Sequence, residues 1–358
     1  MIDVTRNHQL DGLRGYAAVM VSVFHTILCM DETLISRIVY GDASKLPDAY
    51  SWFAKVILKI FSGETAVFIF FVLSGTVLFQ SLMRARRPFL SEASIFTVRR
   101  LVRIYPALII CLAVMALYSI AIGRPVSLYD FAVNSALYAF PINGVTWTLN
   151  VEVAAVGFIL AAYLGWCVGS EWGLIAVAVG VGIALRSPWL QSVAVTFKNF
   201  WIFFVLGMLI PTRIGAWIAR MVPMIAWPFV LLVVIIFKST LQQAAIALLV
   251  TLLYYNKTGG LGHVLEKPAL QFMGRISYSF YLYNFLVFNV ICSYLKQWPL
   301  VASHPIETGL LASIPVIAIT ILFAYFSTRF VEVPGIEFGR AISSRPGTVR
   351  QTSSVFDL

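Results

Sequence analysis

The first apolar segment of the chain carries three titratable side chains on one face of a predicted helix. Asp11, Arg14 and His25 all fall within residues 10–30, and Arg14 and His25 are eleven residues apart. At about 100° per residue, eleven residues make three turns plus roughly 20°, and Asp11 lies one turn before Arg14. A charged side chain inside a membrane helix costs about 2.5–3.5 kcal/mol, so such residues mark functional sites. His25 is a candidate general base; the alternative is a histidine that packs between helices.

A second group of residues is a pair of arginines at the start of a later apolar segment. Arg100 and Arg103 lie one helical turn apart, just after the arginines at positions 84–87. Two guanidinium groups on one face can hold a phosphate through bidentate hydrogen bonds. The alternative is a signal for membrane topology or a contact with anionic lipid headgroups.

A third group places a carboxylate and a small-residue break inside apolar helices. Glu152 follows Trp147 and precedes a long run without a charge, so we expect it to pair with a cation, with Arg14 or His25 as the candidates. A glutamate in interfacial water is the alternative. Ser74 and the glycine after it interrupt bulky apolar residues, and such small residues line a cavity or allow close helix packing.

These residues must be positioned by membrane helices, because the composition leaves room for little else. The chain has 358 residues, of which 60% are hydrophobic and only 12% are charged, whereas soluble proteins carry about 25% charged residues. The sequence predicts an all-α, polytopic membrane protein with about ten spanning helices. They are expected near residues 10–30, 61–83, 101–122, 146–168, 171–186, 194–211, 217–237, 239–256, 276–296 and 309–330.

The net charge of +10 follows the membrane topology and does not indicate a nucleic-acid partner. With ten spans and a cytoplasmic N-terminus, seventeen of the 26 Lys and Arg residues fall on the cytoplasmic side. Both termini are then cytoplasmic. The loop 31–60 lies outside, and within it residues 52–61 read as an interfacial helix with snorkelling lysines. We expect a membrane domain over residues 1–338 and a disordered cytoplasmic tail over 339–358.

The cysteines and histidines predict no metal site. The four cysteines, Cys29, Cys111, Cys167 and Cys292, stand singly in apolar segments and read as buried small hydrophobes. The four histidines show no metal-pair spacing.

Taken in order, the motifs of this chain resemble those of the acyltransferase-3 family of integral membrane acyltransferases. The resemblance extends from residue 10 to residue 334 and includes a departure at Asn284, where members often have histidine. The matching segments are Leu-Asp-Gly-Leu-Arg-Gly at 10–15 with His25, Phe-Phe-Val-Leu-Ser-Gly at 70–75, Arg-Arg-Leu-Val-Arg-Ile-Tyr-Pro at 99–106, Trp-Thr-Leu-Asn-Val-Glu at 147–152, Gly-Arg-Ile-Ser-Tyr-Ser-Phe-Tyr-Leu-Tyr at 274–283 and Phe-Val-Glu-Val-Pro at 330–334.

The resemblance implies an O-acyltransferase of the inner membrane that moves an acyl group, usually acetyl, from cytoplasmic acyl-CoA to a hydroxyl. Its acceptors would be surface or exported carbohydrates or lipid-linked sugars, reached among the membrane lipids. The acyl-CoA would be bound by Arg100, Arg103, Ser74 and Tyr105. The catalytic set would be His25, as general base or as a transient acyl carrier, with Arg14, Asp11 and Glu152.

Two other classes of membrane protein fit part of the pattern. A secondary transporter or proton-coupled exporter could use the intramembrane Asp, Arg, His and Glu as a proton relay. Such transporters usually show an internal repeat, which this sequence lacks, and the titratable residues here gather in the first four predicted helices. The other large class of membrane O-acyltransferases usually places its histidine well along the chain, whereas His25 lies in the first helix.

Overall fold

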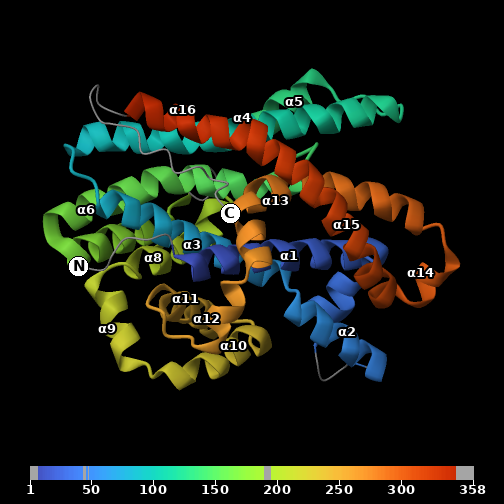
Figure 1. The fold of residues 1–358 in the computed structure, drawn as a ribbon, viewed down its shortest axis with the longest axis horizontal. Helices are drawn as coiled ribbons and strands as arrows, with labels where there is room; N and C mark the ends of the chain where they lie inside the picture. Colours follow the sequence, from blue (N-terminus) through green and yellow to red (C-terminus); the bar gives the residue numbers. More distant parts are fainter. Residues whose placement is uncertain (1–6, 43–45, 47, 189–194, 344–358) are drawn as a thin grey trace.

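The computed structural model describes residues 7–42, 46, 48–188 and 195–343 (Figure 1). Within these residues the secondary structure is helical, without strands, as expected in a bilayer, where a helix satisfies its own backbone hydrogen bonds. The helices are α1 (His8–Met30), α2 (Ala49–Ile60), α3 (Gly63–Met83), α4 (Phe89–Ala121), α5 (Leu128–Ser135), α6 (Trp147–Ala184), α8 (Trp201–Leu209), α9 (Arg213–Met221), α10 (Trp227–Ile236), α11 (Thr240–Tyr254), α12 (Gly260–Leu265), α13 (Pro268–Leu295), α14 (Pro299–Ser303), α15 (Pro305–Ser327) and α16 (Val333–Ser343).

Six helical segments in the described residues are long and apolar enough to cross a membrane, or seven if a bent pair counts as one span. The predicted fold class, an all-α polytopic membrane protein, is therefore confirmed. The six are His8–Met30, Ala49–Met83, Phe89–Ala121, Gly144–Ala184, Pro268–Leu295 and Pro305–Ile342.

One of these segments, α6, contains a sharp turn. Gly169 and Ser170 have non-helical backbone angles, with φ of +51° at Ser170. A Cβ added to Gly165 would lie 2.6 Å from the carbonyl oxygen of Gly173 and 2.7 Å from a side-chain carbon of Val177. Residues so far apart along a straight helix could not touch, so the chain reverses here. The two arms correspond to the predicted helices 146–168 and 171–186.

The segments predicted at 194–211, 217–237 and 239–256 form shorter helices than expected. Pro211 and the capping residue Thr212 end one helix and begin another, so that α8 and α9 bend by 76°. Pro223 and Pro228 interrupt the next segment, since proline lacks a backbone donor. The helices Met224–Ile236 and Thr240–Tyr254 are both shorter than a full span. The count of ten spans stays a prediction.

At the centre of the structure, α1 packs against α13 in parallel (Figure 1). Glycines bring the two backbones together: a Cβ on Gly274 would lie 2.0 Å from the carbonyl oxygen of Asp11, and one on Gly15 would lie 2.3 Å from that of Leu270. Farther along, the Asn284 amide donates to the Ser22 hydroxyl at 2.7 Å. Two spanning helices that run in the same direction must have an odd number of membrane spans between them in the chain. The predicted order has seven such spans, from the second to the eighth.

The loop 31–60 contains the predicted short helix, which is α2. Its lysines differ from the expectation of snorkelling. Lys55 is buried and donates to the carbonyl oxygens of Ile38 at 3.2 Å and Gly41 at 2.7 Å. Lys59 donates to Ile236 at 2.6 Å. Both ammonium groups therefore donate to backbone carbonyl oxygens.

The C-terminal part continues past α15 through a short π-helix, Thr328–Glu332, into α16, which lies along α4 (Figure 1). The predicted boundary between residues 338 and 339 falls inside α16. The rest of the predicted tail, residues 344–358, lies outside the described residues.

Candidate active site

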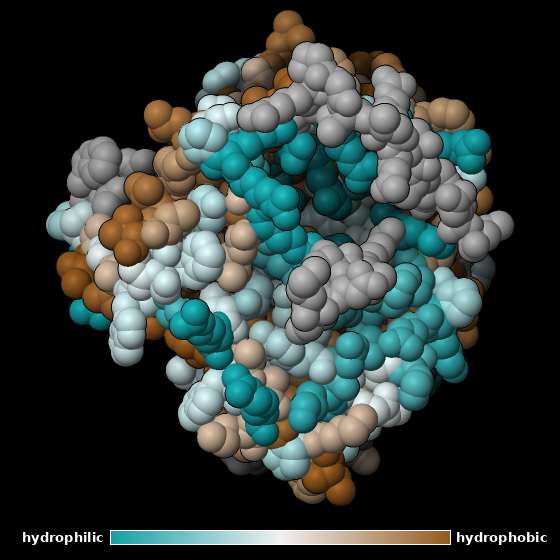
Figure 2. Space-filling view, turned by 60° about the vertical axis from the view of Figure 1, so that its left-hand side comes forward, coloured by the Kyte–Doolittle hydropathy of each residue, from teal (hydrophilic) through white to brown (hydrophobic). Residues whose placement is uncertain are grey.

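A cavity of about 100 Å³ lies among α1, α3, α4, α6 and α13. It can hold a small acyl group or a few waters. Hydrophilic residues surround a hollow on the end of the molecule that is at the left of Figure 1 (Figure 2). The cavity is lined by Arg14, Val67, Phe70, Phe71, Ser74, Val77, Leu78, Arg100, Arg103, Ile104, Thr148, Leu149, Glu152, Ser277, Tyr278 and Tyr281.

Glu152 lies on the cavity wall and pairs with Arg100. Nη2 of Arg100 donates to Oε2 of Glu152, and the Ser74 hydroxyl donates to Oε1 at 3.2 Å. The side chains of Arg100 and Glu152 are only 10% and 17% exposed. The expected pairing of Glu152 with Arg14 or His25 is thus corrected, because α4 brings Arg100 closer to it. The three residues connect α3, α4 and α6 through one charged contact.

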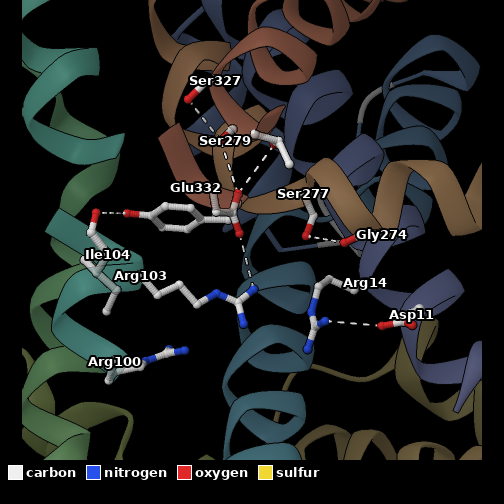
Figure 3. Close-up of polar contacts among 12 residues, drawn as sticks. Asp11, Arg14, Arg100, Arg103, Ile104, Gly274, Ser277, Ser279, Ser327 and Glu332 are labelled. Atoms are coloured by element: carbon white, nitrogen blue, oxygen red, sulfur yellow. Dashed lines mark hydrogen bonds and ion pairs between the residues drawn. The ribbon is translucent and has the colours of Figure 1, made fainter. Parts of the chain in front are cut away.

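Arg14 also lines the cavity, and its partner is Asp11 of the same helix. Nη1 of Arg14 lies 3.4 Å from Oδ1 of Asp11, one turn earlier (Figure 3). Both side chains are largely buried, at 22% and 11% exposed. The shared helix face predicted from the spacing of these two residues is confirmed.

The third arginine of the cavity, Arg103, pairs with Glu332 at 3.5 Å. The Glu332 side chain is 3% exposed, and its Oε2 accepts hydrogen bonds from the hydroxyls of Ser279 at 3.3 Å and Thr328 at 3.5 Å (Figure 3). Glu332 ends the π-helix Thr328–Glu332, and short π-helical segments often occur at functional sites. We did not predict a role for Glu332 from the sequence, although a lone carboxylate two residues before Pro334 was a usable signal.

The three guanidinium groups of Arg14, Arg100 and Arg103 therefore converge on one cavity from α1 and α4 (Figure 3). Each one has a carboxylate partner, so the cluster is close to neutral overall. A guanidinium has five N–H donors, and one carboxylate engages only part of them. Nε of Arg100 is buried without a partner among the described residues. Donors of this kind suit an anionic or carbonyl oxygen entering the cavity.

His25 lies apart from the cavity wall. Its ring stacks on Phe288 with centroids 5.6 Å apart and planes 8° apart, and it meets Phe24 edge to face at 5.6 Å. Eleven residues of α1 separate it from Arg14, which is about 16 Å at 1.5 Å per residue. The structure thus places His25 and the arginines at different depths along the same helix.

Polar side chains lie along α13 between these two depths. Tyr281 lines the cavity and donates to the carbonyl oxygen of Val145 at 2.9 Å. One turn farther, buried Asn284 bonds Ser22 at 2.7 Å and Thr320 at 3.5 Å. The next turn carries Phe288 beneath His25. The seam between α1 and α13 is therefore polar at its middle turns.

Three of the four residues of the predicted acyl-CoA site line the cavity, and the fourth does not. Ser74 lines the cavity, as do Arg100 and Arg103. Tyr105 packs instead against a buried apolar group that includes Leu108 and Leu286, away from the cavity lining. Among the described residues, no group of three or more His, Cys, Asp or Glu side chains is placed to hold a metal ion.

A bundle of membrane helices around a buried, charged cavity defines an integral membrane protein with an internal reaction or transport site. The chain belongs to the acyltransferase-3 family, because its residues 7–329 match that family's acyltransferase domain. It is therefore a membrane acyltransferase. Neither the curated proteins nor the solved structures contain a match to this chain.

Proposed function

We propose that this acyltransferase moves an acyl group, foremost acetyl, from cytoplasmic acyl-CoA to a hydroxyl of a surface or exported carbohydrate or a lipid-linked sugar. The observation that carries the proposal is the convergence of Arg14, Arg100 and Arg103 on one cavity within the acyltransferase domain. An acyl-CoA has phosphates at one end and the reactive thioester at the other, joined by a long flexible arm. Such a donor suits a site whose cationic cluster and base are separated in depth.

The arginine cluster would hold the phosphates or the oxygens of the donor arm. Glu152 and Glu332 would hold Arg100 and Arg103 in place by ion pairing. Their negative charges also reduce the cost of burying two arginines before the donor arrives. Asp11 would do the same for Arg14.

His25 would act as the general base. The acceptor oxygen attacks the thioester carbonyl carbon, and a neutral His25 nitrogen takes the hydroxyl proton. The carbon–sulfur bond then breaks, and the departing CoA sulfur takes that proton. In the alternative, His25 itself carries the acyl group between donor and acceptor. The apolar rings of Phe24 and Phe288 would keep water away from the thioester.

The site also requires an orientation in the membrane. We infer that the protein lies in the inner membrane with both termini cytoplasmic, so that the cavity faces cytoplasmic acyl-CoA. The distribution of Lys and Arg supports this direction. The parallel packing of α1 and α13 supports an odd number of crossings between them.

Binding of radiolabelled acetyl-CoA to the purified protein tests the donor site. Arg100→Ala removes a charge-assisted contact worth about 1.5–3 kcal/mol, so we expect acetyl-CoA to bind roughly tenfold to a hundredfold more weakly. Arg124→Ala is the matched control, since Arg124 is exposed in the segment between α4 and α5. Equal affinity of the Arg100 and Arg124 variants would exclude the arginine cluster as the donor site.

A further inference from the structure

The helices α1 and α13 stay in register over their last turns. The contacts follow one another in order: Ser22 with Asn284 at 2.7 Å, then His25 stacked on Phe288. At the ends of the two helices, Lys296 lies 3.4 Å from Glu32. His25 and Phe288 lie about one turn beyond Ser22 and Asn284, and Glu32 and Lys296 lie about two turns farther on. The register therefore also determines which residues face each other in the turn between His25 and Glu32.

Cys29 and Cys292 occupy that intermediate turn. Both thiols are free, and the register of the contacts on either side places them opposite each other on α1 and α13. Cys292 is fully buried in an apolar cluster that includes Met30 and Phe288, whereas Cys29 packs against the edge of that cluster and is partly exposed. From the sequence we read the four cysteines as single buried hydrophobes, because residues so distant in the chain give no local signal of a contact.

We propose that Cys29 and Cys292 are a redox-active pair that closes to a disulfide linking α1 to α13. Adjacent turns of closely packed helices can meet the geometry that a disulfide needs. The pair lies at the C-terminal ends of both helices, which the proposed orientation places on the outer side of the membrane. Disulfides form and persist in that oxidising environment. The inference depends on this orientation and does not depend on the acyl-transfer chemistry.

The oxidant would be a disulfide, either that of a thiol–disulfide oxidoreductase or that of a small molecule. The Cys29 thiolate, formed by loss of its proton, attacks one sulfur of that disulfide and displaces the other as a thiolate. The Cys292 thiolate then attacks the Cys29 sulfur of the mixed disulfide and displaces the second sulfur. The pair loses two electrons and two protons, and the oxidant gains both to become a dithiol or two thiols.

A disulfide here would fix the α1–α13 seam one turn beyond His25. The spacing of the two helices at His25 and Phe288 could then change little, because the link and the glycine contacts near Gly274 would hold both ends of the seam. The reduced pair would leave the outer end of the seam free to open. The redox state of the pair would therefore regulate access to His25 from the outer side.

The test is a count of free thiols in the purified full-length protein. The Cys167→Ser variant removes the exposed cysteine, so Cys29, Cys111 and Cys292 remain. Cys111 is buried and serves as the internal reference that stays reduced. After incubation with oxidised glutathione, the protein is denatured in N-ethylmaleimide and its intact mass is measured. We expect the number of maleimide adducts to fall from three to one and to return to three after dithiothreitol. Peptide mapping should show Cys29 linked to Cys292.

Two further variants and the wild type serve as controls. Cys29→Ser and Cys292→Ser, each combined with Cys167→Ser, should give no internal cross-link and only alkylated or glutathionylated single cysteines. Wild-type protein should give the same linked peptide, so the result does not depend on folding of a variant. Three adducts after oxidation, or glutathione on Cys29 without a link to Cys292, would overturn the proposal.

Discussion

Arg100 and Glu152 form a largely buried ion pair between α4 and α6, and Ser74 of α3 donates to the same carboxylate. This pair, rather than one between Arg14 and Glu152, holds the cavity wall together. One carboxylate of α6 thus neutralises Arg100 of α4 and accepts a hydrogen bond from α3. Its removal should therefore affect stability as well as activity.

Glu152→Gln should lower thermal stability and turnover together. Breaking one side of a buried ion pair costs about 3–5 kcal/mol, because the other charge is left without its partner. The double variant Arg100→Gln, Glu152→Gln should recover part of that loss, as measured by thermal unfolding in detergent. The matched cycle uses Arg14→Gln with Glu152→Gln, for which the coupling energy should be clearly smaller. A larger coupling with Arg14 than with Arg100 would contradict the pairing.

The contact between α1 and α13 depends on glycine, and Gly274→Ala tests it. The added Cβ would lie 2.0 Å from the backbone oxygen of Asp11, so the helices must separate. We expect a marked fall in the unfolding temperature and loss of activity, because Asp11 and Arg14 move with α1. Gly157→Ala is the control, since nothing lies within 4 Å of its Cβ position. Equal unfolding temperatures for the two variants would show that the close approach is absent in the membrane.

The site residues differ in how much of their placement the sequence could predict. Asp11 and Arg14 share one helix, so their common helix face followed from the helical period alone, although we expected Glu152 rather than Asp11 to pair with Arg14. Arg100 and Arg103 also share a helix, so their common face followed from the same period, and both line the cavity. The partners of Glu152 and Arg103 come from other helices, and periodicity carries no information about which helices adjoin. Glu332 was missed as a partner for this reason.

The fold, too, was predicted well in some parts and poorly in others. Hydropathy correctly predicted an all-α membrane protein and the two arms of α6, because runs of apolar residues report burial directly. It overestimated the helices around residues 194–256, where Pro211, Pro223 and Pro228 shorten the helices within apolar sequence. It also assigned Lys55 to the interface, because a lysine that caps carbonyls of its own loop cannot be distinguished by composition from one that reaches water.

The orientation of the protein can be tested by accessibility of introduced cysteines. In protein with Cys29 and Cys167 replaced by serine, Ser36→Cys should react in intact cells with an impermeant maleimide, and Ser91→Cys should not. Both serines are exposed, and they lie on opposite sides of the α3 span. Labelling of Ser91→Cys should appear only after the cells are broken open. The reverse pattern would place the arginine cluster on the side without acyl-CoA.

The most direct test of the central claim is acetyl transfer by His25→Ala. Inverted membrane vesicles from cells that contain the native acceptors would receive radiolabelled acetyl-CoA, and label in the carbohydrate fraction would be followed over time. His263→Ala is the matched control, because the His263 side chain is 85% exposed. We expect His25→Ala to transfer about 10²- to 10⁴-fold more slowly at unchanged acetyl-CoA binding, and His263→Ala to match the wild type. Wild-type transfer by correctly inserted His25→Ala protein would contradict the assignment of His25 as the base.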